Sequence, residues 1–468
     1  MDQESQSRLA ALEQELVAAR ARWEEERQSL LAEIRKLSGE VARLESENTR
    51  LREQLERAQR EGARQAGPFR RDPKHKIAEK DRKRPGRKPG HPGASRQIPE
   101  TIDEQVEVPL CGCPGCGGPV DRMRKVEQYI QELPEVRPVT TKVTTYVGRC
   151  TKCGEVRSTH PLQTSTAEGA AKVQLGPRTL AWAAELNKRL GLSFRKTCSL
   201  FEKLLGLKLT PGGLSQALDR VAQRCRGEYY RVLDRIRASA VVYADETSWW
   251  VGETGWWLWT FTTPQATFYR VEQSRGKAIV RKTLGREFAG VLVSDCARIY
   301  DEIKCRKHKC IAHHLQAIQQ ARDLQNPRYH SYLDAWTEFF RRVIALWKER
   351  HQLPPPEYEN RRTNLEQQCD ELLGREPRFP GDKKVRTRLL RVRPHLLTCL
   401  ASLDVEPTNN RAERSLRPAV IARKLSCGNR TILGKQTWEI IHTLAVNCHQ
   451  LAQPLCEYLA PKLQLAAA

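Results

Sequence analysis

Two short apolar segments that each end in an aspartate constrain the fold of this chain more than any other feature of its sequence. Asp245 directly follows AVVYA, and Asp295 directly follows GVLVS. Between them lies GWWLWTFTTPQATFYRVEQS, in which apolar and polar residues alternate as they do in strands that bury one face. The pattern predicts a mixed sheet at the centre of an α/β domain that spans residues 236–425.

The two aspartates are candidate ligands of a divalent cation. A carboxylate at the end of a buried strand is held on a rigid frame and faces a cleft, so core packing does not explain it. Two Mg²⁺ ions about 3.5 to 4 Å apart need a shared bridging carboxylate and further oxygen ligands. Two aspartates in one sheet fit this requirement, and we expect Mg²⁺ or Mn²⁺ to bind at Asp245 and Asp295.

A third carboxylate is expected from a helix that crosses the same edge of the sheet. The run DVEPTNNRAERSLRPAVIARKLSCGN offers Glu406 and Glu413. Glu406 precedes a proline, which favours an extended backbone. Glu413 lies in a stretch with helical character, so we predict that it completes the magnesium ligands. Three neighbouring arginines are candidate DNA phosphate contacts: Arg411, Arg414 and Arg417.

The charge of the chain indicates a polyanionic partner. Its 80 lysines and arginines exceed its 56 aspartates and glutamates by 24, and the sequence pI is about 9.6. Nucleic acid fits this excess. An acidic membrane surface is the alternative, but the sequence has neither a run of about 20 apolar residues nor a signal peptide. We therefore expect a soluble, cytoplasmic protein that binds double-stranded DNA and no membrane.

Large apolar residues recur every seven positions in residues 1–60, which is typical of a coiled coil. Asn48 falls in the second apolar series, where a buried polar residue fixes the register and favours two strands. We predict a homodimer or a higher oligomer through this helix; an amphipathic helix packed on the rest of the chain is the alternative. The main series consists of Leu9, Leu16, Trp23, Leu30, Leu37, Leu44 and Leu51.

Residues 61–100 are predicted to be a basic linker. Proline and glycine interrupt any helix there, and lysines and arginines occur in clusters. Such an arm is either solvated chain or a contact to the DNA backbone or minor groove. Arg87 and Lys88 are its candidate DNA contacts.

Two CxxC motifs in residues 101–165 predict a small zinc ribbon. Each motif is followed by glycine and forms a tight turn whose two thiolates point at one cation, so two such turns supply a tetrahedral Zn²⁺ site. A redox CxxC is the alternative, but it explains only one pair. Cys111 is a possible substitute ligand. The predicted zinc ligands are Cys113, Cys116, Cys150 and Cys153.

Residues 170–235 show a helical pattern interrupted by turns. A helix at Phe194–Leu205 and a second from Pro211 to about Gln223 resemble a helix-turn-helix, with Thr210 as the N-cap of the second. Helix pairs of this kind also occur in bundles that do not bind DNA. Two basic residues of the first helix are candidate DNA contacts: Arg195 and Lys196.

The whole pattern predicts a multidomain α+β protein. Its order is a coiled coil, the basic linker, the zinc ribbon, a helical DNA-binding region and a mixed α/β core. Amphipathic helices predict a helical insertion in that core at about 315–400. Residues 426–468 are expected to form a helical tail.

Several motifs together resemble the transposases of the insertion-sequence 66 family. They are DET followed by tryptophan, GETGWWLW, SRG, GVLVSD, CIAH and EPTNNRAERSLRP. The likeness runs through almost the whole chain, since that family also has a leucine-zipper-like helix, a CxxC/CxxC segment and an RNase H-like core with a DDE triad. It implies that Asp245, Asp295 and Glu413 are that catalytic triad.

The sequence departs from the family pattern after CIAH, where His314 and Gln316 stand in a segment that usually carries an arginine. It also departs near SCGN, where Cys427 interrupts a glycine pair. None of these departures touches the triad. His313 either orients a phosphate or carboxylate, or has a structural role.

The resemblance implies phosphoryl transfer by a bacterial, nucleoid-associated enzyme. A metal-activated water and then a 3′-hydroxyl would attack phosphodiesters at the terminal inverted repeats and in target DNA. One alternative is a catalytically inactive DNA-binding regulator derived from a transposase, against which the intact carboxylates speak. The other is an RNase H-like nuclease or resolvase, which cleaves without joining; a dimerisation helix and several DNA-binding modules favour assembly on paired ends instead.

Overall fold

The computed structural model describes residues 15–41, 43–44, 47, 51, 96–166 and 173–465. The chain divides into two compact units, Met1–Tyr129 and Ile130–Ala468. Arg87 and Lys88 lie outside the described residues, as do Leu9 and Asn48 of the predicted coiled coil. Within the described ranges, no helix is long and apolar enough to cross a membrane.

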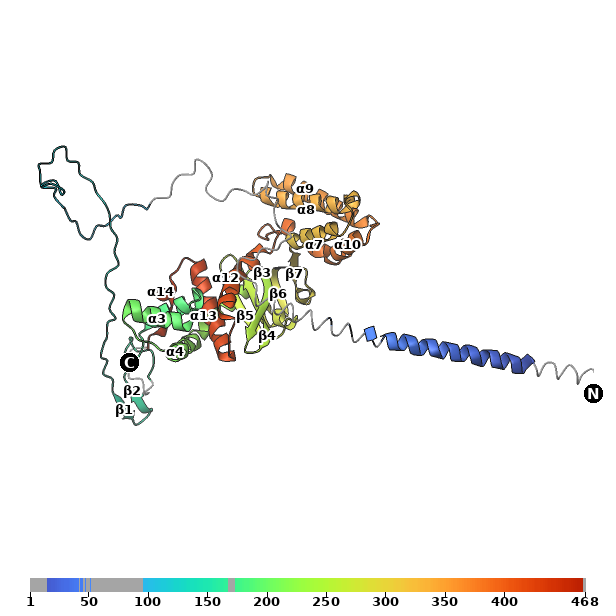
Figure 1. Ribbon diagram of the computed structural model, residues 1–468, viewed down its shortest axis with the longest axis horizontal. Helices are drawn as coiled ribbons and strands as arrows, with labels where there is room; N and C mark the ends of the chain where they lie inside the picture. Colours follow the sequence, from blue (N-terminus) through green and yellow to red (C-terminus); the bar gives the residue numbers. More distant parts are fainter. Residues whose placement is uncertain are drawn as a thin grey trace, which may run out of the picture. The chain divides into compact units, whose positions relative to one another are not determined.

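The first unit contains the N-terminal helix, which is drawn in blue in Figure 1. Residues 15–41 are helical throughout, so the predicted helix is confirmed over this range. Its heptad residues are exposed in the single chain: Leu16 by 55%, Trp23 by 64% and Leu30 by 55%. Among the described residues of the first unit, none covers this apolar stripe.

A five-stranded mixed sheet lies at the centre of the second unit (Figure 1). Strands β3, β4 and β5 are successive antiparallel neighbours, whereas β6 and β7 run parallel to β3 on its other side. The order across the sheet is β5-β4-β3-β6-β7. The predicted mixed sheet is thus confirmed, with strands Val241–Val251, Thr254–Thr262, Thr267–Glu272, Glu287–Ser294 and Lys304–Lys309.

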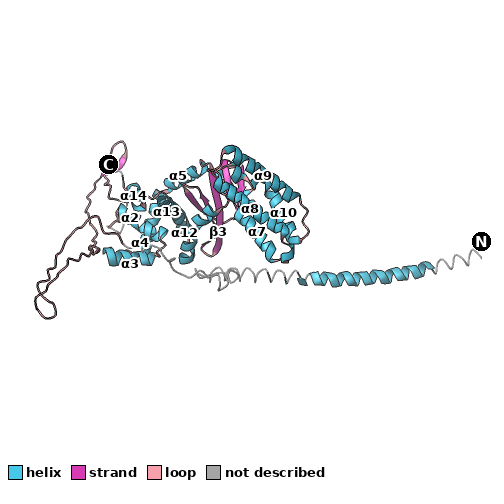
Figure 2. Cartoon of the chain, turned by 90° about the horizontal axis from the view of Figure 1, so that it is seen from above, coloured by secondary structure: helices cyan, strands magenta, loops and turns pink. Residues whose placement is uncertain are grey.

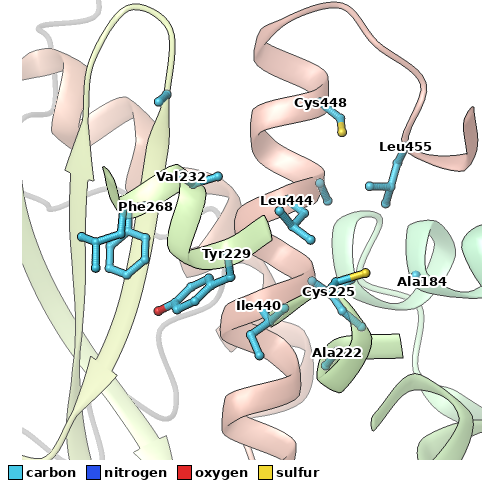
Figure 3. Packing of buried hydrophobic residues seen from close by; sticks show 14 of the residues in the cluster. Ala184, Ala222, Cys225, Tyr229, Val232, Phe268, Ile440, Leu444, Cys448 and Leu455 are labelled. Atoms are coloured by element: carbon cyan, nitrogen blue, oxygen red, sulfur yellow. The ribbon is translucent and has the colours of Figure 1, made fainter. Parts of the chain in front are cut away.

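Helices cover one face of this sheet and form the largest hydrophobic core. Side chains alternate along a strand, so Val242 and Ala244 of β3 enter this core while Tyr243 faces the other way. Tyr229 packs between the sheet and the last long helix, its ring centroid 4.6 Å from that of Phe268 (Figure 3). Helices α5 (Arg226–Arg237) and α13 (Ile432–Gln450) contact β5 directly. Helices α4 (Pro211–Arg224) and α14 (Leu455–Leu459) pack on α13, and α2 (Pro177–Ala184) and α3 (Phe194–Leu205) pack on α4.

Two of these helices match the predicted helix-turn-helix boundaries. The first spans Phe194–Leu205, and the second begins at Pro211 with the Thr210 hydroxyl accepting the N–H of Gly213 at 3.1 Å. The inner face of α4 is buried in the core, at residues such as Leu214 and Leu218. The helix pair therefore packs on the sheet domain, and its basic N-terminal residues remain outside this core.

The helical insertion covers the other face (Figure 2) and has its own core around Trp336 and Phe340. Tyr243, Val291 and Val293 of the sheet belong to this second core. The range at about 315–400, in which the sequence predicts an insertion, consists mostly of helices. Its helices are α7 (Ile311–Asp323), α8 (Ser331–Glu349), α9 (Pro355–Gly374), α10 (Pro380–Val392) and α11 (Thr398–Ala401), after which α12 (Asn410–Ser426) returns to β3 and β4.

Helix α13 protects the edge strand β5. Glu439, Thr443 and Asn447 lie one turn apart on α13, and each accepts a backbone N–H of the strand. The donors alternate along β5 in step with the helix turns: Val271, Tyr269 and Thr267. Because these N–H groups are already bonded, the edge is not available for pairing with another strand.

Candidate active site

The sheet brings Asp245 and Asp295 to the same level. Strands β3 and β6 are parallel neighbours, and Tyr243 is paired with Val293. Asp245 comes two residues after Tyr243, within β3, and Asp295 comes two residues after Val293, just beyond the last residue of β6. Neighbouring strands are about 4.8 Å apart, so this register places the two aspartates side by side. They lie at the edge of the sheet where β6 ends, and not on an edge strand.

Helix α12 carries Glu413 in its first turn and starts directly over this edge. The buried Asn409 donates from Nδ2 to the carbonyl of the residue before Asp245, at 2.9 Å. The hydroxyl groups of Ser415 and Thr260 lie 3.0 Å apart, and Thr260 is the cross-strand partner of Asp245. Two contacts thus fix the start of α12 beside Asp245.

The three carboxylates interact electrostatically. Burial is the largest cause that raises the pKa of Asp245, from 3.8 to about 7, and repulsion from the adjacent Glu246 is the next. The charges of Asp295 and Glu413 raise it further, which requires both of them to lie near Asp245. The sheet and α12 therefore bring together three residues that are far apart in the sequence.

The donor set suits a hard divalent cation. Oδ1 of Asp245 accepts the N–H of Glu246, and Oδ1 of Asp295 accepts that of Ala297, both at 2.9 Å. Carboxylate oxygens are the ligands that Mg²⁺ prefers, and a cation would relieve their repulsion. Across the described part of the chain, no three His, Cys, Asp or Glu side chains form a ready-made metal-binding group.

A second layer of contacts surrounds the candidate ligands, and the sequence reasoning missed it. The Glu246 side chain is only 2% exposed; it pairs with Arg275 at 2.8 Å and accepts a hydrogen bond from the Tyr300 hydroxyl. The Arg275 guanidinium also lies 4.6 Å from the ring centroid of Trp257. In the sequence, these contacts were indicated only by the presence of Glu246 in DET and of Arg275 in SRG. That the two side chains meet is visible only in the folded structure.

The predicted phosphate-binding arginines of α12 differ in their surroundings. Arg411 pairs with Glu406, with Nε 3.1 Å from Oε1, and its guanidinium lies 5.4 Å from the Tyr243 ring centroid. Glu406 is thus neutralised by a neighbour. Arg414 and Arg417 are exposed on the helix that carries Glu413.

The helical pair presents its predicted DNA contacts to solvent. Arg195 and Lys196 are both exposed in the first turn of α3. The backbone N–H of Lys196 donates to the hydroxyl of the N-cap residue Ser193, and the residue itself is exposed on the surface.

The two CxxC motifs lie in different units of the chain. In the first unit, backbone N–H groups of Gly115 and Cys116 lower the pKa of the Cys113 thiol. In the second, Cys150 ends β1 (Val147–Cys150), which pairs antiparallel with β2 (Gly154–Arg157). Backbone N–H groups in the connecting turn, that of Cys153 first, lower the pKa of Cys150. Each turn thus favours the thiolate of its first cysteine, and the shared zinc site stays a prediction.

His313, the last residue of the CIAH motif, is half-buried, and His314 directly after it is buried. His314 is buried, its Nε2 lies 3.4 Å from the sulfur of Cys296, and its ring stacks on Phe340. The main-chain carbonyl of His313 accepts a hydrogen bond from Arg388 of α10 at 3.4 Å. The side chain of His314 thus has structural surroundings next to the segment that follows Asp295, and the role of the His313 side chain stays open.

Comparison with known proteins identifies the family. A search of curated proteins gave no significant match. The family model described as transposase IS66 family matches residues 172–437, a range that contains the sheet, the insertion and the start of α13. Because this match covers more than half of the chain, the protein belongs to the transposase IS66 family.

Proposed function

We propose that this transposase cleaves DNA at the ends of its insertion sequence and joins those ends to target DNA. Asp245, Asp295 and Glu413 would be its catalytic carboxylates. The observation that carries the proposal is their convergence at one edge of the sheet, from the middle of β3, the end of β6 and the start of α12. Membership of the family supports a transposase in general.

An RNase H-like core is part of the same proposal. The strand order supports it: three antiparallel strands are followed by two that lie parallel to the first, on its other side. The final acidic helix follows a helical insertion and packs back on the first strand. This arrangement is what a DDE core with an insertion before its glutamate requires.

The reaction consists of two phosphoryl transfers. In the first, a water oxygen bonds to phosphorus while the bond to the 3′-oxygen breaks, which leaves a 3′-hydroxyl. In the second, that hydroxyl oxygen bonds to a target phosphorus, and the displaced target 3′-oxygen leaves as a hydroxyl. Divalent cations held by the three carboxylates would activate the attacking oxygen and stabilise the leaving one.

Residues of the chain itself would position these groups. Asn409 and Ser415 hold the first turn of α12, and with it Glu413, against β3 and β4. Arg414 and Arg417 project from the same helix and are suited to contact DNA phosphates. Most of the rate enhancement would come from such fixed charges and dipoles.

The remaining DNA-binding and assembly functions are proposed for the outer parts of the chain. The exposed heptad stripe of residues 15–41 supports a homodimer or higher oligomer, because an uncovered apolar stripe of this spacing favours a partner helix. The turns at the two CxxC motifs support a structural Zn²⁺ site. Arg195 and Lys196 would contact the ends of the insertion sequence.

The test is Mg²⁺-dependent cleavage and joining of labelled DNA that carries the ends of the insertion sequence. Wild-type protein is compared with Asp295→Asn and with Asp323→Asn, an exposed aspartate at the end of α7. We expect joined products from the wild type and from Asp323→Asn, and none from Asp295→Asn, which should still bind the DNA.

Two other results would point elsewhere. Cleaved but unjoined products from the wild type would indicate a nuclease or resolvase. Tight DNA binding without metal-dependent products from any of the proteins would indicate a regulator derived from a transposase.

A further inference from the structure

The segment that follows β6 connects Asp295 to the helical insertion. Arg391, near the end of α10, donates from Nη2 to the main-chain carbonyl of Cys296 at 2.8 Å. Its Nη1 lies 3.3 Å from a carboxylate oxygen of Asp301. Cys296 is the residue directly after Asp295, so a single guanidinium spans the start and the end of the segment 295–301.

The same segment is held from the other side by β7. Lys309 is fully buried, and its ammonium group lies 2.8 Å from Asp301 and 3.2 Å from the hydroxyl of Ser294. Ser294 directly precedes Asp295. Asp301 is therefore shared between a buried lysine of the sheet and an arginine of the insertion, and Asp295 lies between the residues they hold.

The position of Arg391 is fixed by its own helix. Leu389 and Val392, on either side of it in the sequence, are buried in the core of the insertion. Arg388, one turn earlier, donates to the main-chain carbonyl of His313 at the start of α7. The insertion thus reaches the sheet edge with an anchored helix.

A purely structural ion pair does not account for Arg391 well. The side chains of Arg391 and Asp301 are 33% and 39% exposed, and pairs with that exposure add little to stability. The bond to the Cys296 carbonyl adds a geometric constraint instead. A planar guanidinium holds two acceptors in a fixed relative geometry, whereas a lysine ammonium carries rotatable donors on a flexible stem.

We propose that Arg391 is a positioning residue that fixes the Asp295 segment in the conformation required to bind a divalent cation. The helical insertion would then take part in catalysis through this residue, without itself touching the reacting atoms. This role rests on the proposed function of Asp295 as a metal ligand. Residues that orient a metal ligand typically change metal affinity 10- to 100-fold when they are removed.

The experiment measures Mn²⁺ binding to the full-length protein by calorimetry, with and without DNA of the insertion-sequence ends. The variants are Arg391→Met, Arg391→Lys and, as the matched control, Arg386→Met. Arg386 lies on the same helix but contacts Glu376 and the carbonyl of Leu373, both away from the site. Hydrogen exchange of residues 295–301 in the metal-free protein is the second readout.

We expect Arg391→Met to weaken Mn²⁺ binding at least about 10-fold and to speed hydrogen exchange of the segment. The KM for DNA should stay unchanged while kcat falls at limiting metal. Arg391→Lys should lie in between, and Arg386→Met should match the wild type. If Arg391→Met does not fold, the Mn²⁺ affinity of Arg391→Lys tests the proposal instead. An affinity below that of the wild type would support it, and an affinity equal to that of the wild type would overturn it.

Asp295→Asn separates this inference from the proposed function. If Asp295→Asn weakens Mn²⁺ binding and Arg391→Met does not, the positioning role of Arg391 is wrong, while the role of Asp295 as a metal ligand is supported. If Asp295→Asn binds Mn²⁺ like the wild type, the metal role of Asp295 is wrong, and the role of Arg391 falls with it.

Discussion

Removal of the charge of Asp245 should stabilise the metal-free protein at neutral and alkaline pH. Burial, the adjacent Glu246 and the other two carboxylates raise its pKa from 3.8 to about 7. Because the folded state holds this proton more tightly than the unfolded chain does, folding loses stability as the pH rises from about 4 to about 7. Below that window the group does not affect the free energy of unfolding, and above it the loss is complete.

The size of the effect follows from the shift. About three pKa units at 1.36 kcal/mol each correspond to a penalty on the order of 4 kcal/mol at pH 8, and to about 2 kcal/mol at pH 5. Asp245→Asn removes the charge while the amide oxygen can still accept the N–H of Glu246. The variant should therefore exceed the wild type in stability at pH 8 by a few kcal/mol, and match it near pH 4.

Urea denaturation followed by tryptophan fluorescence measures this difference, since Trp249 and Trp259 are buried in the sheet domain. The titration is run without divalent cations at pH 4, 5 and 8, with Asp323→Asn as the control for loss of an exposed charge. Added Mg²⁺ should stabilise the wild type more than Asp245→Asn. A variant that is no more stable than the wild type at pH 8 would refute the view that burial and repulsion of the Asp245 charge cost stability.

Three further outcomes are expected. Asn447→Ala should lower the free energy of unfolding by about 1 to 3 kcal/mol in urea titrations, because it leaves the buried N–H of Thr267 on β5 without its acceptor. The control His449→Ala, on the exposed side of α13, should have little effect. Trp336→Ala should remove about 3 to 5 kcal/mol from the insertion, measured by the same titration, because this side chain is fully buried at the centre of its core. Bound zinc, measured by atomic emission on purified protein, should be lost in Cys113→Ser and retained in Cys111→Ser; equal zinc contents in the two variants would contradict the predicted ligand set.

The sequence predicted those parts of the fold that depend on local patterns. Alternating apolar residues indicated the sheet, and Asp295 follows the last residue of β6 as expected. Asp245, expected at a strand end, lies instead in the middle of β3, because the strand continues through the alternating residues up to Val251. The boundaries of α3 and the start of α4 were predicted because capping is local: Thr210 and Pro211 are adjacent to the helix that they begin. Glu413 was chosen over Glu406 because a proline follows Glu406; that choice stays a prediction, and Glu406 pairs with Arg411 in the structure.

The contacts around the site could not be predicted in the same way. Glu246, Arg275 and Tyr300 meet only after β3, β5 and β6 have assembled, and nothing in their spacing indicates that they meet. The bonds from α13 to β5 join residues more than 160 positions apart. Such pairs are set by tertiary packing, so periodicity and capping signals carry no information about them.

The anchors and the repulsion at this edge have one physical explanation. Three like charges near one another would separate if their segments were free, because each gains by moving into water. Asn409 prevents this for α12, and Arg391 with Lys309 restrains the segment after Asp295. The carboxylates are therefore held close at a cost to the metal-free fold, and a cation that binds there recovers that cost as affinity. If that is so, variants that relax the anchors should bind the cation more weakly than the wild type.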